Sequence, residues 1–411
     1  MLLVVLLLVV AARLAGLAFG QTQEGQPPAQ RPRRAPAQNN SNRPAADGPA
    51  AARPSGTSAG ARTGPVEVGE DEVLTVETQL VPVPVVVRDR AGRPVPNLRA
   101  ENFVLYEDER PQRISNFSTS DAPFEVALLL DTSGSTRADL GLIRRAANLF
   151  IEQLRKGDRV AVVSFKTIEE DGERRAEVEV NSPLTDDRDD LEEAIEKIGT
   201  SNGTPLYDAL ERVVKEVFRE PPREGAEGRR ALVALTDGVD STSVAEFEET
   251  RARLLRSGVF GYFVQVNTED YVEERLLRDC RDRGQLGLSK VQLERYRRIF
   301  AKQSDASDFS SFCQMGPFER MHISRTLYQL ARTEMQDLAR ETGGRTFPAS
   351  DLRDARRAFA QVAEEIGKLY SLGYYPTNKA RDGRFRAIRV EVKGLPGATV
   401  TAREGYQAPK S

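Results

Sequence analysis

The stretch Glu125-Val-Ala-Leu-Leu-Leu-Asp-Thr-Ser-Gly-Ser135 decides the fold of this chain. From Val126 to Leu130 it is continuously apolar, which is typical of a strand buried on both faces of a parallel sheet. It ends in oxygen-bearing side chains at Asp131, Ser133 and Ser135. Because open α/β sheets bind their ligands at the carboxyl ends of strands, we expect these oxygens at a binding edge.

One carboxylate and two hydroxyls at alternate positions are hard donors, which favour Mg²⁺ or Ca²⁺ over Zn²⁺. The alternative is an ordinary strand-to-helix turn, in which Ser133 or Ser135 caps the next helix. Two later stretches of the chain bear on this choice.

The composition excludes several classes of function. The chain has 411 residues, enough for one to three domains, and a formal net charge of -3, so no global basic field indicates nucleic-acid binding. Its one histidine, His322, excludes any site that needs two histidines, including the commonest catalytic zinc sites. Two cysteines are too few for a four-cysteine zinc site.

Residues 1–20 are predicted to be a secretory signal peptide. Their apolar run ends at Arg13 and is short for a membrane span, and small residues precede a possible cleavage site at Gln21. No basic residue precedes the run, so an uncleaved anchor is the alternative. We therefore expect a secreted, periplasmic or cell-envelope protein, with no membrane span apart from this segment.

The next two segments differ sharply in composition. Residues 21–68 are rich in Pro, Ala and Arg and lack aromatic residues, which predicts a disordered linker. Residues 69–122 show short strand patterns. The strand over 81–87 is expected at a sheet edge, because Pro82 and Pro84 cannot donate to a ladder.

The remainder predicts an α/β domain inserted into a small β-sandwich. Residues 123–369 alternate buried strands with amphipathic helices, as in a doubly wound, mostly parallel sheet. Residues 267–323 fit this pattern less well and are taken as a charged insertion with one helix. Strand patterns return over 370–411. We expect 69–122 and 370–411 to pair into one sandwich, because neither half has enough strands to bury its apolar face.

Two further oxygen-bearing positions follow the first motif in the chain. Thr204 precedes Pro205 and is expected to N-cap the helix that Pro205 opens, and Asp237 directly follows an apolar strand. In a doubly wound sheet both positions can reach the same edge as Asp131. Together these hydroxyls and carboxylates suit Mg²⁺, with Mn²⁺ or Ca²⁺ as alternatives.

These pieces resemble the metal-ion-dependent adhesion site (MIDAS) of von Willebrand factor A (VWA) domains. The matching pieces are Asp131-Thr-Ser-Gly-Ser135, Thr204 in Gly-Thr-Pro-Leu-Tyr-Asp, and Asp237 in Leu-Thr-Asp-Gly. The resemblance implies that Asp131, Ser133, Ser135, Thr204 and Asp237 hold the metal, directly or through water. It also implies that an open coordination position accepts an Asp or Glu side chain of a protein partner.

The flanks resemble those of bacterial secreted VWFA-related proteins. The shared stretches include Val-Arg-Asp-Arg-Ala-Gly-Arg-Pro-Val-Pro over 87–96 and Leu-Gly-Tyr-Tyr-Pro over 372–376. We expect a binding module and not an enzyme. A Mg²⁺-dependent phosphohydrolase with Asp131 as nucleophile would lack the second Asp two residues on that aspartyl-phosphate hydrolases use. The sequence also leaves open a structural envelope scaffold that the metal only stabilises, and a degenerate domain that binds no metal.

Cys280 and Cys313 both fall in the insertion. In an oxidising compartment a disulfide between them is predicted, with two free buried thiols as the alternative.

Overall fold

The computed structural model describes residues 80–119, 122–134, 140–170, 172–278, 288–300 and 315–410. The predicted signal peptide, the linker, Ser135, Cys280 and Cys313 lie outside the described residues. Within the described ranges, no helix combines the length and apolarity needed to cross a membrane.

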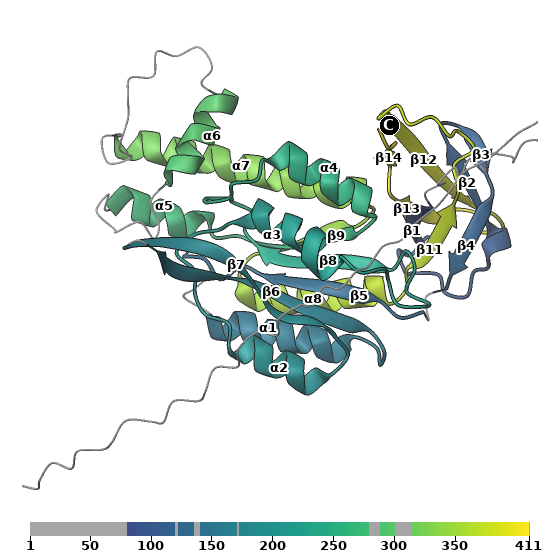
Figure 1. Ribbon diagram of the computed structural model, residues 1–411, viewed down its shortest axis with the longest axis horizontal. Coiled ribbons are helices and arrows are strands. Elements are labelled where there is room, and N and C mark those ends of the chain that lie inside the picture. Colours follow the sequence, from purple (N-terminus) through teal and green to yellow (C-terminus); the bar gives the residue numbers. More distant parts are fainter. Residues whose placement is uncertain are drawn as a thin grey trace, which may run out of the picture. The chain divides into compact units, whose positions relative to one another are not determined.

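A six-stranded sheet with the order β10-β9-β8-β5-β6-β7 forms the centre of the α/β region (Figure 1). Every neighbouring pair is parallel except β6 and β7. All residues of β5 are buried, as its apolar sequence predicts, because neighbouring strands and both helical layers cover it. The predicted fold class is thus confirmed. The strands are β5 (Glu125–Leu130), β6 (Arg159–Glu170), β7 (Glu173–Thr185), β8 (Arg230–Thr236), β9 (Phe260–Val266) and β10 (Arg345–Ala349).

Helices cover both faces of this sheet and build two separate apolar cores. One face carries α1 (Leu140–Gln153), α2 (Arg188–Glu196) and α8 (Leu352–Ile366). The other carries α3 (Leu206–Arg212), α4 (Phe247–Ser257) and α7 (Pro317–Thr342), and a π-helix at Val213–Val217 continues α3.

The insertion contains more helix than its sequence predicted. It contributes α5 (Glu269–Arg278), α6 (Lys290–Phe300) and the first turns of α7, whereas one helix was predicted there. A small apolar cluster joins α6 to α7, with Leu293, Met315, Ile323 and Leu327 buried in it.

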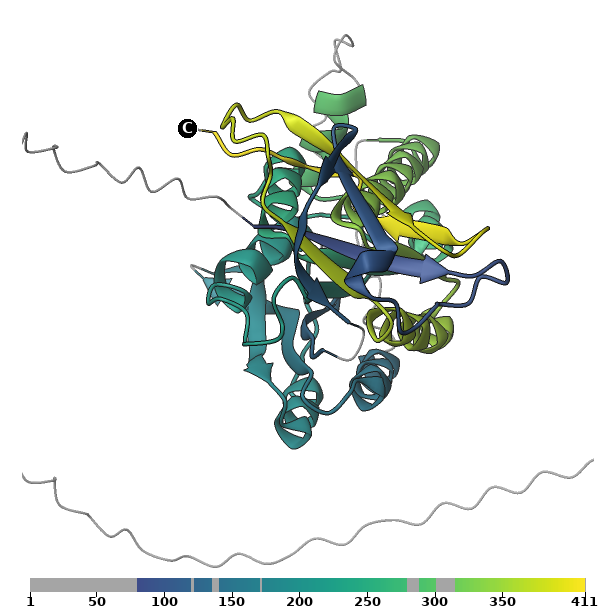
Figure 2. The ribbon, with the colours of Figure 1, turned by 90° about the vertical axis from the view of Figure 1, so that its right-hand side faces the viewer.

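The flanking strands form two antiparallel sheets, in the orders β13-β1-β11-β4 and β14-β12-β2-β3. Each sheet combines strands from before and after the α/β region, which are the blue and the yellow strands in Figure 2. Both sheets contribute side chains to one apolar core, as the sandwich prediction requires. The strands are β1 (Val81–Arg88), β2 (Phe103–Glu107), β3 (Arg110–Gln112), β4 (Ile114–Ser118), β11 (Tyr370–Tyr374), β12 (Phe385–Val392), β13 (Thr399–Ala402) and β14 (Gly405–Gln407). A 3₁₀ turn, Ala100–Asn102, precedes β2.

The prediction that β1 is an edge strand is wrong, because β1 lies between β13 and β11. The prolines are accommodated because β13 pairs only with the second half of β1, from Val85 to Arg88. The half that contains Pro82 and Pro84 pairs with β11 alone. On its open side, the guanidinium of Arg403 donates to the carbonyl oxygen of Pro82 at 3.2 Å.

Candidate metal centre

The strands β5 and β8 end side by side and bring two acidic residues to the same edge of the sheet. Leu130 is in register with Leu235, and the backbone N–H of Asp131 donates to the carbonyl of Leu235 at 2.9 Å. Asp237 directly follows β8. Parallel pairing therefore places the two predicted carboxylates together, as the sequence indicated.

Asp131 is completely buried and held in one orientation. Its carboxylate accepts a hydrogen bond from the hydroxyl of Thr236 at 2.7 Å and another from the backbone N–H of Ser133 at 3.0 Å. Burial, together with the negative charge of Asp237, raises the pKa of Asp131 to about 7. A bound cation would favour the ionised form of both carboxylates and oppose this repulsion.

Ser133, Thr204 and Asp237 line a single cavity of about 70 Å³. They come from the ends of β5 and β8 and from the start of α3, and their exposed fractions are 1%, 5% and 3%. This volume has room for an ion with coordinated water. The structure thus brings these predicted ligands together, whereas Ser135 lies outside the described residues.

Thr204 does not cap the following helix, so that prediction is wrong. Pro205 occupies the N-cap of α3, and the buried carboxylate of Asp240 accepts from the backbone N–H groups of Leu206 and Tyr207 at 2.9 and 3.3 Å. Because Asp240 caps the helix, the hydroxyl of Thr204 is not needed for capping. The backbone N–H of Thr204 donates to the hydroxyl of Ser241 at 2.8 Å, which holds Thr204 beside the cavity that it lines.

Two residues that the sequence analysis did not identify hold Asp237. Thr268 donates its hydroxyl hydrogen to Asp237 at 2.6 Å, and the hydroxyl of Tyr328 lies 2.7 Å from that of Thr268. Because Thr268 has only one hydroxyl hydrogen, Tyr328 is the donor in the second bond. Thr268 follows β9 at the carboxyl edge of the sheet, a position that could have signalled it. Tyr328 lies on α7, and no sequence signal relates it to this edge.

The donor set fits a hard divalent cation. It combines two carboxylates with the hydroxyls of Ser133 and Thr204, which are oxygen ligands of the kind that Mg²⁺ and Ca²⁺ prefer. Across the described part of the chain, no cluster of three or more His, Cys, Asp or Glu side chains could hold a metal.

The sequence around this edge also matches a family. A family model for the von Willebrand factor type A domain matches residues 126–239, a span that contains Asp131, Ser133, Thr204 and Asp237. The chain contains a VWA domain. A comparison with curated proteins finds no match.

Several solved structures are similar to this VWA-domain protein. Proximal thread matrix protein 1 from the mussel byssus is 15% identical, with a TM-score of 0.37, over 72% of this chain and 50% of that one. A von Willebrand factor type A protein from Catenulispora acidiphila is 12% identical, with a TM-score of 0.38, over 82% of this chain and 75% of that one. The pilus adhesin SpaC from Lactobacillus rhamnosus GG, in an open conformation, is 9% identical, with a TM-score of 0.37, over 77% of this chain and 49% of that one. The chain thus spans about half the length of the mussel protein.

Part of the insertion lines the candidate metal centre of this VWA domain, through Val272 of α5, Leu288, and Gln292 of α6. The part of α7 that follows the insertion adds Ser324, Leu327 and Tyr328. A buried ion pair between Arg295 and Glu334 joins α6 to α7. The insertion therefore forms one wall of the site, a placement that its sequence did not reveal.

Proposed function

We propose that the VWA domain binds a protein partner through a divalent cation held at this edge of the sheet. Mg²⁺ is the expected ion, with Mn²⁺ or Ca²⁺ as alternatives. One observation carries the proposal. The same small cavity is lined by three residues that are far apart in sequence, Ser133, Thr204 and Asp237. The buried carboxylate of Asp131 is close enough to Asp237 for the charge of Asp237 to raise its pKa.

Each residue has a defined part in this proposal. Ser133, Ser135 and Thr204 would contribute hydroxyl oxygens, and Asp131 and Asp237 would contribute carboxylates directly or through water. Thr236 and Thr268 keep the two carboxylates oriented through their hydrogen bonds. When bound, the cation would supply a coordination position for an Asp or Glu side chain of the partner.

We propose a binding module and not an enzyme. His322, the one histidine of the chain, is exposed on α7 and does not line the cavity. The second candidate function is a structural scaffold in which the metal only stabilises the domain. The near-complete burial of the proposed ligands supports this candidate. The signal-like sequence of residues 1–20 supports a secreted, periplasmic or envelope location. The Cys280–Cys313 disulfide also stays a prediction.

Calorimetric titration of Mg²⁺ and Mn²⁺ into the full chain tests the site. We expect saturable binding that is lost in Asp131→Ala and strongly weakened in Thr204→Ala. The Thr204 variant is informative because the hydrogen bond from Thr204 to Ser241 is made by the backbone N–H, which alanine keeps. Asp189→Ala removes an exposed carboxylate on α2 and serves as the control. Equal metal binding by all four proteins would refute the assignment.

Access of a carboxylate to the metal separates the two candidate functions. With Mn²⁺ bound, we expect the proton relaxation of added acetate to be enhanced by the wild-type protein and much less by Thr204→Ala. Metal binding without any enhancement would favour the scaffold, because no carboxylate would then reach the ion.

A further inference from the structure

A second cavity lies between the sandwich and the end of α4, and its walls are strongly basic. Its volume is about 840 Å³, within the size range of ligand sites. The lining includes five cationic side chains and no carboxylate: Arg256, Lys379, Arg381, Arg386 and Arg403. This contrasts with the slightly acidic chain as a whole.

Arg403 places an uncompensated positive charge in the floor of this cavity. Its side chain is 3% exposed and donates to three carbonyl oxygens, those of Pro82, Leu255 and Gly405. It forms no ion pair with any described residue, and burial lowers its pKa to about 10. A buried cation with only neutral acceptors is stabilised when an anion binds nearby.

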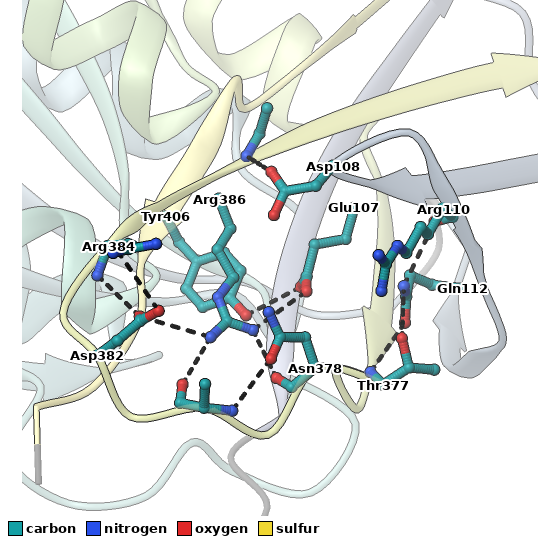
Figure 3. A network of polar contacts seen from close by, with 12 residues as sticks. Glu107, Asp108, Arg110, Gln112, Thr377, Asn378, Asp382, Arg384, Arg386 and Tyr406 are labelled. Carbon is teal, nitrogen blue, oxygen red and sulfur yellow. Dashed lines mark hydrogen bonds and ion pairs between the residues drawn. The ribbon is translucent and has the colours of Figure 1, made fainter.

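Arg386, which also lines the cavity, is 2% exposed and lies at the centre of a polar network (Figure 3). Its own charge is balanced by Glu107 at 3.4 Å and Asp382 at 3.7 Å. Its guanidinium N–H groups also donate to the carbonyls of Asn378 and Ala380. These bonds fix the loop that carries Lys379 and Arg381, both of which line the cavity. The rim cations are thus presented by a loop that a buried network holds in place.

We propose that this cavity binds an acidic peptide segment, with carboxylates placed against the cationic side chains. The walls also contain Leu80, Val81, Pro82, Leu255 and Pro409, so the ligand must combine anionic and apolar groups. A peptide that alternates acidic and apolar residues does so. A polyphosphate has no apolar groups to contact the apolar part of the walls. Single-stranded nucleic acid binds by stacking its bases on aromatic rings, and Tyr406 is the one aromatic residue among the lining residues.

Fluorescence anisotropy of the full chain with a short labelled peptide of alternating glutamate and valine tests the proposal. The titration is done in EDTA, so that the candidate metal centre does not contribute. We expect saturable, salt-sensitive binding that weakens roughly fivefold or more in Arg256→Glu and Lys379→Glu, since each reverses a rim charge. Both residues are exposed and form no ion pair in the described structure, so these variants are expected to fold.

Lys393→Glu supplies the matched control, because Lys393 is a cation of the sandwich outside the cavity. It should bind the peptide like wild type, and the glutamine version of the peptide should not bind. Equal loss in Lys379→Glu and Lys393→Glu would overturn the proposal. So would the absence of peptide binding, or tighter binding of tripolyphosphate or oligothymidine than of the peptide.

Discussion

Gly343 lies so close to Pro84 that a side chain at this glycine would collide with the proline ring. A Cβ atom on Gly343 would be 2.6 Å from Cγ of Pro84 and 3.0 Å from the backbone nitrogen of Arg403. Gly343 also ends α7 in the left-handed conformation, with φ 84°. The end of a VWA helix is thus fitted against the first strand of the sandwich.

Gly343→Ala should lower the free energy of unfolding by about 3 kcal/mol, since it adds a steric collision to the left-handed strain. Gly394→Ala is the control. Gly394 also has a positive φ, of 79°, but a Cβ atom added there would meet no other atom within 4 Å, so strain alone should cost about 1 kcal/mol. Urea unfolding of both variants checks this. Equal losses would show that the contact with Pro84 contributes nothing.

Thr268→Val should weaken Mg²⁺ binding about tenfold, because it removes the hydrogen bond that orients Asp237 without removing a ligand. Thr333→Val makes the same change on the exposed side of α7, where the hydroxyl donates to the carbonyl of Gln329. Calorimetric titration should find wild-type affinity in that control. An unchanged affinity in Thr268→Val would mean that the hydrogen bond from Thr268 to Asp237 does not contribute to Mg²⁺ binding.

Glu107→Gln should destabilise the sandwich by about 3 kcal/mol. The buried carboxylate accepts from Tyr374 at 2.7 Å and Tyr406 at 2.9 Å, and it balances Arg386. A glutamine would satisfy the tyrosines through its oxygen but would turn its amide hydrogens toward the guanidinium.

The neighbouring surface pair provides the comparison for this change. Glu109 and Arg389 are 2.7 Å apart but largely exposed, so Glu109→Gln should destabilise the protein far less than Glu107→Gln does. Chemical denaturation of the two variants measures the difference. Similar costs would argue against a special role for the buried charge.

Asp240 should make stability depend on pH. Burial raises the pKa of Asp240 to about 6, above its usual 3.8. Between these values the folded state binds more protons than the unfolded state, so the contribution of Asp240 to stability falls as the pH rises from about 4 to 6. The unfolding free energy of wild type minus that of Asp240→Asn should decline over this range by on the order of 3 kcal/mol. A difference independent of pH would contradict the prediction.

The sequence by itself determined the parts of the fold that depend on local pattern. The apolar run over 126–130 required a strand buried on both faces, and Asp131 and Asp237 were predicted at strand ends that parallel pairing brings together. The incomplete strand sets before and after the α/β region predicted a shared sandwich. These inferences succeed because backbone hydrogen bonding and side-chain periodicity act over a few residues.

Only the tertiary structure decided which distant groups satisfy one another. Asp240, and not Thr204, caps α3. Arg403 donates a hydrogen bond to Pro82 in the half of β1 that β13 does not pair with. Tyr328 hydrogen-bonds to Thr268, which in turn donates to Asp237. The basic cavity likewise joins α4 to loops of the sandwich. A hydrogen-bonding or charged side chain can be satisfied by many partners along the chain. Which partner it meets depends on how the packed elements place it, and no local pattern encodes that choice.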